Sequence, residues 1–461
     1  MIFTTNIYFF NKKRNTIFYK ILKLNKFKKH LFQIILSNTF KKIIIKNIMI
    51  EIIITLILGV FLGTITGIIP GLHVNTVGII IFSISTTLLK YTTALCLCTF
   101  FVSLAICHAM MEFLPSLLIG VPNEDTILSI QPAHRLLLKG ESRKVIRLVS
   151  FGGYSSIIIL ILIMPILFVI LPPIYYGLKN YIGYLLIIVM SIMIYKSNKN
   201  NITRMMSLLI FLISGILGII ILSSYLGSNM GLLCMLSGLF SISTLLYSVN
   251  NESSIPPQNN DKSIVVNSDF KKSVFAGSIS GCILGLLPGL GPAQGTLIAQ
   301  TLLFKKNITP EDFLITNSGI NISDTLFSLM AIYLINNPRS AISVYVNDLI
   351  QNITLNHVLF FIFISLMSAS LSCILAIRIG DRLIDNISKF NYRKLNIVII
   401  VLITGIILIY CIVNHGCLWY IFLCYITSIA LGILVNVLDL SKSNLMGVLI
   451  VPSILMYLGI L

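Results

Sequence analysis

The chain has 461 residues, of which 56% are hydrophobic and 10% are charged, against roughly 25% charged residues in an ordinary soluble domain. The formal net charge is +18. Residues 1–48 supply 11 Lys and Arg and no acid, so 22 basic and 15 acidic residues remain from position 49 onward. An excess of that size is typical of basic cytoplasmic loops. The composition therefore excludes a soluble globular protein, and we expect no nucleic-acid partner.

Residues 1–48 form a basic, low-complexity N-terminal extension of mainly Ile, Phe, Asn and Lys. Two interpretations are open. Either the start is assigned too early and Met49 is the initiator, or the segment is amphipathic and lies on anionic lipid. A cleaved signal peptide is disfavoured, because no compact apolar stretch is followed by a small-residue cleavage site.

Long apolar runs follow one another after the extension. A helix of about 20 residues crosses a hydrocarbon core about 30 Å thick, and these runs are too long and continuous for the alternating strands of a membrane barrel. We therefore predict an all-α, multi-pass protein of the cell membrane with about 11–14 hydrophobic segments, including re-entrant or broken helices. The candidate segments are 50–69, 72–89, 91–111, 146–172, 178–195, 204–224, 228–249, 272–287, 290–304, 313–335, 355–380, 395–413, 416–438 and 445–460.

Lys and Arg cluster in several of the connections between these segments. The largest such cluster comprises Lys139, Arg143, Lys144 and Arg147. Because positively charged loops stay on the cytoplasmic side of a membrane, we expect these connections to face the cytoplasm.

A glycine pattern in the first half of the chain returns in the second half. GVFLGTITGIIPGL begins at Gly59 and GSISGCILGLLPGL begins at Gly277, so the pattern G-x3-G-x3-G-x2-P-G-L recurs at an offset of 218 residues. A second match links 125–129 to 324–328 at an offset of 199 residues. The chain therefore appears as two homologous halves in its sequence.

The polar stretch 250–270 lies between the two copies, where a duplicated protein needs a linker. We predict a first membrane repeat at 49–249 and a second at 271–461. An odd number of crossings between the two Pro-Gly-Leu motifs makes the repeats inverted, which is the arrangement we expect. Short half-helices leave the count itself open.

Each glycine run ends in a predicted helix break, at Pro70 in the first half and Pro288 in the second. Glycines four residues apart allow another helix to approach closely, and proline followed by glycine interrupts a helix. A helix that restarts after such a break points free N–H groups and the positive end of its dipole into the gap. Two broken helices at matching positions indicate the binding site of a secondary transporter.

Polar residues follow both breaks, and acidic residues lie further along the chain. Ionisable groups at membrane depth are expensive and usually functional. Apolar sequence flanks Asp324 on both sides, whereas Asp125 is either a cation ligand or simply a loop residue or helix cap. The candidate substrate-binding residues are Gly71, His73, Asn75, Thr76, Gly289, Gly291, Gln294 and Asn321, and the candidate ion-coupling residues are Asp324, Asp125 and Thr325.

Three further ionisable residues each have two interpretations. His108 and Glu112 lie four residues apart at the end of an apolar run, which suits a proton relay or merely a buried pair. Arg339 either meets an anionic substrate or anchors a loop at the membrane interface. The nine cysteines form no C-x-x-C pair, so we expect no cofactor and no metal site beyond one for Na⁺.

Taken together, these motifs resemble the large permease of the tripartite tricarboxylate transporters. The shared features are the doubled Pro-Gly-Leu breaks, Gly-Val-Pro-Asn-Glu-Asp-Thr at 120–126, Asn-Pro-Arg-Ser at 337–340 and Lys-Ser-Asn-Leu-Met-Gly at 442–447. Pro-Gly-Leu-His-Val-Asn-Thr at 70–76 and Pro-Gly-Leu-Gly-Pro-Ala-Gln at 288–294 resemble its archaeal branch. The resemblance spans about 50–460.

The resemblance implies a two-half permease that takes up carboxylates with an ion gradient, by an elevator-like movement. Typical bacterial systems add a small membrane subunit and an extracellular binding protein as partners, while a version independent of partners is the alternative. His73 departs from the commoner Pro-Gly-Leu-Gly form of the first break.

Three classes of function compete for this sequence. The first is a secondary active transporter that holds a small organic anion between the two broken-helix tips and couples it to Na⁺ or H⁺. The second is a membrane-embedded enzyme or flippase acting on a lipid-linked substrate, and the third is a passive channel. The sequence has no H-E-x-x-H, G-x-S-x-G or Walker-type motif, which disfavours an enzyme or an ATP-driven pump. We therefore expect a non-enzymatic carrier in contact with lipid, either alone or as a homo-oligomer.

Overall fold

The structure is a computed structural model that describes residues 48–70, 72–118, 120, 125–198, 200–224, 227–249, 256–287, 290–302, 308–386, 392–413 and 416–461. The chain divides into two compact units, Met1–Ile54 and Thr55–Leu461. The N-terminal extension lies outside the described residues, apart from its last residue. Within the described ranges the chain is almost entirely helical and has no strand.

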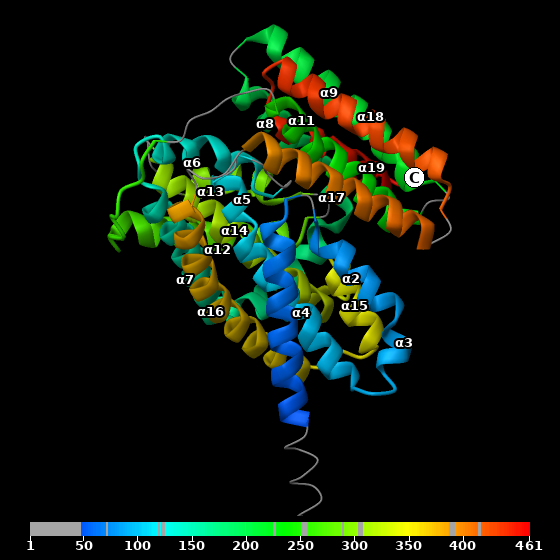
Figure 1. The fold of residues 1–461 in the computed structure, drawn as a ribbon. Helices are drawn as coiled ribbons and strands as arrows, with labels where there is room; N and C mark the ends of the chain where they lie inside the picture. The colour runs from blue at the N-terminus through cyan, green and yellow to red at the C-terminus, as the bar shows by residue number, and fades with distance from the viewer. Residues whose placement is uncertain are drawn as a thin grey trace, which may run out of the picture. The chain divides into compact units, whose positions relative to one another are not determined.

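Figure 1 shows the helices in chain order. The first is Ile48–Ile68. The others, in chain order, are α2 (Val74–Ser83), α3 (Ser85–Leu88), α4 (Ala94–Met111), α5 (Phe113–Leu118), η1 (Ile127–Ser129), α6 (Ile130–Leu137), α7 (Ser142–Leu178), η2 (Lys179–Tyr181), α8 (Ile182–Ser197), α9 (Asn201–Leu222), α10 (Gly227–Leu236), η3 (Ser237–Ile242), α11 (Ser243–Ser248), α12 (Ser268–Leu284), α13 (Pro292–Leu302), α14 (Pro310–Ile335), α15 (Ala341–Leu349), α16 (Leu355–Asn386), α17 (Tyr392–Val413), α18 (Leu418–Val437), η5 (Lys442–Met446) and α19 (Gly447–Tyr457).

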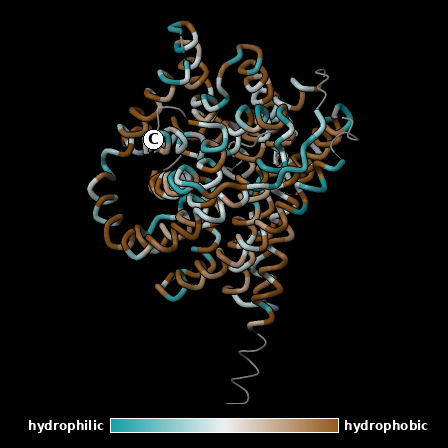
Figure 2. The backbone as a smooth tube through the Cα atoms, turned by 90° about the vertical axis from the view of Figure 1, so that its left-hand side faces the viewer, coloured by the Kyte–Doolittle hydropathy of each residue, from teal (hydrophilic) through white to brown (hydrophobic). Residues whose placement is uncertain are grey.

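Nine helices of the described chain are long and apolar enough to cross a membrane. Figure 2 shows hydrophobic residues along much of the backbone. The prediction of an all-α, multi-pass membrane protein is therefore confirmed. The predicted segments 72–89 and 290–304 contain only short helices, because each lies next to a Pro-Gly break and holds polar residues.

Two of the nine spans form the buried centre of the second unit. In the most apolar window of Ala94–Leu118, 89% of the residues are buried, and in that of Pro310–Ile335 the share is 78%. The corresponding share for Arg393–Val413 is only 28%. Such a low share leaves much of the helix surface for lipid, so α4, α5 and α14 are the spans best placed to hold a polar site away from lipid.

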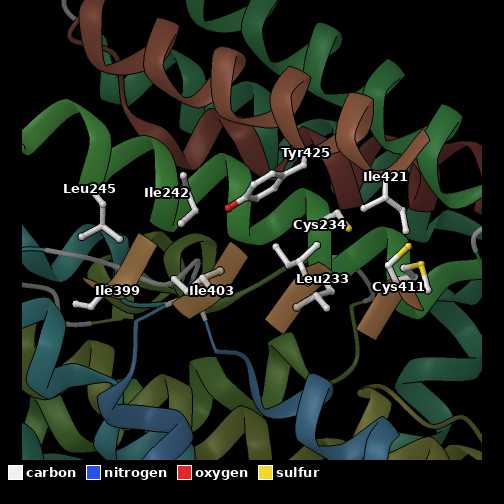
Figure 3. Close-up of a cluster of buried hydrophobic side chains, with 11 residues drawn as sticks. Leu233, Cys234, Ile242, Leu245, Ile399, Ile403, Cys411, Ile421 and Tyr425 are labelled. Atoms are coloured by element: carbon white, nitrogen blue, oxygen red, sulfur yellow. The ribbon is translucent and has the colours of Figure 1, made fainter. Parts of the chain in front are cut away.

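The helices pack in two groups, and each group draws on both halves of the sequence. In what we term the α14 group, α14 packs against α4, α7, α12 and α16. In the α18 group, α10, η3 and α11 pack against α18, α10 and α11 also pack against α17, and α9 packs against α19. Figure 3 shows the apolar contact of the α18 group, in which Leu233 and Cys234 of α10 meet Ile403 of α17 and Tyr425 of α18. The predicted halves are thus interleaved and do not form separate lobes.

The part of the predicted linker that is described lies against the turn between α6 and α7. The backbone N–H of Asn259 donates to the Gly140 carbonyl oxygen at 2.8 Å, and the side chain of Gln258 bonds to Ser142 and to the Leu137 carbonyl. These bonds fix where the chain crosses from α11 to α12, between the two halves.

The predicted basic connection 139–147 forms ion pairs with α16. The guanidinium of Arg147 is held by both carboxylate oxygens of Asp381, at 2.9 and 2.6 Å, and Arg143 bonds to Asp381 and Asp385. Both arginines are more than 90% buried. This network joins α7 to α16 at one end of the α14 group, and its cytoplasmic orientation stays a prediction.

Candidate functional site

Helix structure is interrupted at both Pro-Gly motifs. In the first half, Ile48–Ile68 ends just before Pro70, and α2 begins at Val74 with His73 as its N-cap. In the second half, α12 ends at Leu284 and α13 begins at Pro292. Gly71, Pro288 and Gly289 lie outside the described residues.

The glycine face of the first broken helix lies directly on the backbone of α4. A Cβ atom added to Gly59 would come within 2.5 Å of the Phe100 carbonyl oxygen, and one added to Gly63 within 2.7 Å of the Leu104 carbonyl oxygen. These distances are below van der Waals contact, so only glycine permits this approach.

The second broken helix, α12, contacts α14 in the same way. A Cβ atom on Gly277 would lie 2.8 Å from the Thr316 carbonyl oxygen, and one on Gly281 would lie 2.7 Å from the Ile320 carbonyl oxygen. The repeated glycine pattern thus serves a repeated contact with a buried span.

The two contacts have a common register. The contacted carbonyls Phe100 and Thr316 differ by 216 positions, as do the pair Leu104 and Ile320 and the first residues of α4 and α14. Each of these helices begins after a threonine N-cap, Thr93 or Thr309, whose side chain accepts a backbone N–H. In this register the position of His108 corresponds to that of Asp324.

The second sequence match, 125–129 with 324–328, does not mark equivalent places in the structure. Asp125 lies in a turn before η1, whereas Asp324 lies in the interior of α14. The two segments share letters but have different local structure.

One polar cluster gathers around the start of α13. The side-chain oxygen of Gln294 accepts the Gly291 N–H at 3.0 Å, and Gln294 is fully buried. A Cβ atom on Gly291 would lie 3.3 Å from a carboxylate oxygen of Asp125. The turn from the first half therefore reaches the break of the second half. We call this set the α13 cluster: Asp125, Ser129, Gly291, Gln294, Thr296 and Asn317.

Asn317 of α14 joins the remaining members of the α13 cluster. Its side-chain oxygen accepts the Thr296 hydroxyl at 3.0 Å, and its amide nitrogen donates to the Ser129 hydroxyl at 2.5 Å. All three side chains are buried. The amide nitrogen of Gln294 is also buried, with no hydrogen-bond partner among the described atoms. A donor without a partner at a helix N-terminus is suited to a carboxylate oxygen of a ligand.

A second polar cluster lies on α4 beside the first break. His108 Nε2 lies 3.7 Å from a carboxylate oxygen of Glu112, and the His73 and His108 rings are 5.5 Å apart. Asn321 of α14 donates to the same Glu112 carboxylate and to the Ala109 carbonyl. We call this set the α4 cluster: Thr66, His73, His108, Glu112 and Asn321.

The structure separates the predicted site residues into these two clusters. Gly291, Gln294 and Asp125 lie in the α13 cluster, and His73 and Asn321 lie in the α4 cluster. The two are linked along α14, where Asn317 and Asn321 are one turn, about 6 Å, apart. The substrate-binding and ion-coupling roles of these residues remain predictions.

Other predicted residues lie close to the two clusters. The backbone N–H of Asn75 donates to the His73 ring at 3.2 Å, and the Thr325 hydroxyl donates to the Asn321 carbonyl at 2.8 Å. Asp324 packs where α12 crosses α14, since a Cβ atom on Gly281 would lie 2.8 Å from its backbone nitrogen. The side chain of Thr76 lies outside the described residues.

The sequence analysis missed several buried polar residues of the site. Ser116 and Thr126 share a hydrogen bond of 2.6 Å that holds the turn of Asp125 against α5. Asn444 of η5 is fully buried, and neither polar atom of its side chain has a hydrogen-bond partner within the described structure. Its motif, Lys-Ser-Asn-Leu-Met-Gly, was a family feature without an assigned role.

Arg339 lies in the connection between α14 and α15, away from the two clusters in sequence. Its guanidinium donates to the Tyr457 hydroxyl at 3.3 Å and lies 5.3 Å from the centre of the Tyr175 ring. Two of its nitrogens are buried without a hydrogen-bond partner among the described atoms. Both earlier interpretations of this arginine therefore stay open.

The described residues include no group of three or more His, Cys, Asp or Glu side chains that could hold a metal ion.

Comparison with known proteins identifies the family. The model of the Tripartite tricarboxylate transporter TctA family matches residues 53–447. The chain belongs to this family. It is 29% identical over 398 residues to the uncharacterized protein MJ1079 of Methanocaldococcus jannaschii, covering 84% of this chain and 94% of that protein. No solved structure matches the chain.

The family confirms the resemblance found in the sequence, and the archaeal relative is consistent with the predicted archaeal branch. With its nine candidate spans, the chain is a multi-pass membrane protein of a transporter family. That membership supports the expectation that it is not an enzyme, and it implies an organic-anion substrate with partner subunits in the family.

Proposed function

We propose that this protein is a secondary active transporter of small carboxylates, coupled to Na⁺ or H⁺. One observation carries the proposal: a polar cluster lies beside each of two interrupted helices, and each of those helices is seated by glycines on a buried span. A passive pore does not require two such matched interruptions, whereas a carrier uses them to hold its cargo at membrane depth.

In this proposal the substrate carboxylate binds at the start of α13. The Gln294 side-chain oxygen occupies the Gly291 N–H, and a carboxylate oxygen would replace it there. The buried Gln294 amide nitrogen then turns to donate to the substrate. At the first break, the Gly71 amide, His73, Asn75 and Thr76 would complete the site, and Asn321 would orient the substrate from α14.

Asp125 gives a reason for ion coupling. Its carboxylate lies close enough to Gly291 to repel an anion that binds there, and a cation beside it would remove that repulsion. We propose that Asp125, with Asp324 and Thr325 on α14, is where the coupling cation acts. A small membrane subunit, an extracellular binding protein and a second copy of the chain are the proposed partners.

The test is transport by the purified full-length chain in lipid vesicles. We expect labelled citrate, succinate or acetate to accumulate against its gradient when an inward Na⁺ or proton gradient is imposed. The same acid should raise the thermal stability of the protein by mass action. Equilibration without accumulation would indicate a channel. If none of the three acids showed binding or flux, the carboxylate assignment would be excluded.

A further inference from the structure

We propose that His108 and Glu112 form a proton-binding pair, in which the Glu112 carboxylate takes up one proton and donates it in a hydrogen bond to the imidazole Nε2. The pair is the α4 counterpart of the predicted ion site. It lies on the most buried span of the described chain, and the two side chains are 4% and 1% exposed.

The hydrogen bonds around Thr66 determine which nitrogen of His108 carries the hydrogen in the neutral ring. The Thr66 hydroxyl donates to the Gly63 carbonyl oxygen at 3.2 Å, so its oxygen is left as an acceptor. His108 Nδ1 lies 2.9 Å from that oxygen, and we assign it as the donor, because this assignment keeps both hydrogen bonds of Thr66. A neutral His108 then presents the lone pair of Nε2, not a hydrogen, toward Glu112.

A lone pair facing a carboxylate is repulsive, and the separation fits that description. Nε2 lies 3.7 Å from the Glu112 carboxylate oxygen, beyond hydrogen-bond distance. Adding one proton converts neutral imidazole and carboxylate, with a net charge of −1, into a neutral hydrogen-bonded pair. Because negative charge at membrane depth is costly, protonation relieves that cost and draws the two groups together.

The groups around Glu112 favour a proton over a metal cation. The second carboxylate oxygen of Glu112 accepts a hydrogen bond from the side-chain nitrogen of Asn321. The same nitrogen donates to the Ala109 carbonyl oxygen at 3.1 Å. Two oxygen acceptors fix the orientation of that amide, so its oxygen points away from Glu112. Na⁺ needs oxygen ligands, whereas imidazole and amide N–H groups face this carboxylate.

The pair is placed so that its charge can act on α14 and on the first helix break. Asn321 belongs to α14, which carries Asn317 of the α13 cluster one turn away. On the other side, the His108 ring lies 5.5 Å from that of His73, the N-cap of α2 at the first break. A change in the charge of Glu112 therefore changes an interaction with each.

Other titratable groups lie on the elements that pack around the pair. His73 on α2 is the one in ring contact with His108, and Cys107 precedes His108 on α4. Asp324 on α14, Cys373 on α16 and Tyr345 on α15 lie on the other helices that pack against α4. Asp324 is the carboxylate in this group, so the experiment includes it.

The inference rests on the proposed function only for the meaning of proton uptake, because proton binding is measurable without transport. Infrared difference spectra of the full-length protein in lipid, recorded between acidic and neutral pH, report protonated carboxyl groups directly. We expect a carboxyl band that is sensitive to deuterium and is lost in Glu112→Gln. Asp324→Asn and Cys107→Ser, the latter a nearly isosteric change next to His108, should keep it.

His108→Gln provides a second measurement should Glu112→Gln fail to fold. Without the imidazole base, the pH midpoint of the Glu112 band should move by about one unit or more. A band that survives in Glu112→Gln, a band lost only in Asp324→Asn, or an unmoved midpoint in His108→Gln would each overturn the proposal.

Transport then tests whether the proton is coupled. A gradient of one pH unit drives up to roughly tenfold accumulation per coupled proton. Two quantities are measured with labelled succinate, citrate or acetate: accumulation driven by the pH gradient, and exchange with equal substrate concentrations on both sides of the membrane. The ratio of accumulation to exchange should fall about tenfold in Glu112→Gln and stay constant in Cys107→Ser. An intact ratio with a lost infrared band would show a proton site that is not coupled, and would overturn the coupling part of the inference while leaving carboxylate transport intact.

Discussion

The two helix breaks have the same support and different chemistry. On both sides, glycines hold a broken helix against the backbone of a buried span, in a register that equates α4 with α14. The first break then faces the imidazoles and carboxylate of the α4 cluster. The second faces the amides and hydroxyls of the α13 cluster, with Asp125 as its acid.

The glycine contacts position both breaks in the same way, whereas the polar side chains beside the two breaks differ in chemistry. Neutral amides and hydroxyls can orient an anion without changing charge, whereas histidine and glutamate can change charge near neutral pH when their surroundings shift them. Equivalent scaffolding with unlike side chains suggests that one break holds cargo and the other responds to an ion.

The largest effect should come from breaking the shared scaffold. Gly63→Leu and Gly281→Leu place side-chain atoms within 2.7 Å of carbonyl oxygens on α4 and α14, and we expect each to cost at least about 3 kcal/mol and to abolish the folded protein. Thermal unfolding and size-exclusion profiles measure this. Gly405→Ala is the matched control, because nothing lies within 4 Å of its Cβ position. If one of the two leucine variants folded normally, the two breaks would not share their support.

A smaller effect should separate the roles of two asparagines on α14. Asn317→Ala removes the partner of Ser129 and Thr296, which should cost about 2 kcal/mol and abolish the thermal shift produced by a carboxylate. Asn321→Ala should reduce that shift less and instead change the pH dependence of transport. Thermal shifts with citrate, succinate and acetate across pH give both quantities. Equal loss of the carboxylate shift in the two variants would contradict the division of roles.

The sequence predicted more of the scaffold than of the site. Glycines spaced four residues apart and followed by Pro-Gly produce a close helix contact and a helix break through neighbouring residues alone. The glycine faces that begin at Gly59 and Gly277, and the breaks after them, could therefore be located from the sequence. The contact between Asp125 and Gly291 joins segments more than 160 residues apart, and no local pattern encodes it. His108 and Glu112 had the correct helical spacing, but the Thr66 bonds that orient the imidazole appear only in three dimensions.

Substitution of Gly120 should disturb the α13 cluster and leave the α4 cluster unchanged. Its φ of +74° is unfavourable for other residues, and a Cβ atom would lie 2.7 Å from the His134 ring. Gly120→Ala should therefore cost about 1–2 kcal/mol and displace the turn that carries Asp125, lowering carboxylate affinity while the Glu112 infrared band persists. Gly459→Ala is matched for strain, since its φ is +72° with nothing within 4 Å. Equal carboxylate binding in both alanine variants would show that Asp125 is not held by this turn.

The smallest expected effect is on the stability of the protein at acidic pH, and it follows from substituting His134 on α6. Burial lowers the pKa of His134 below its usual value, so the folded protein binds this proton less readily than the unfolded chain does. The stabilisation from neutral His134 is present above the unfolded pKa of about 6.5 and is lost as the pH falls below it. His134→Gln should thus flatten the decline of melting temperature with acidification. Glu112→Gln should change that slope in the opposite sense, because the proposed pair gains a proton that stabilises the folded state. Suppose both variants changed the pH dependence of the melting temperature in the same direction. Protonation of Glu112 would then destabilise the fold, and the first break would not differ from the second by a proton-binding pair.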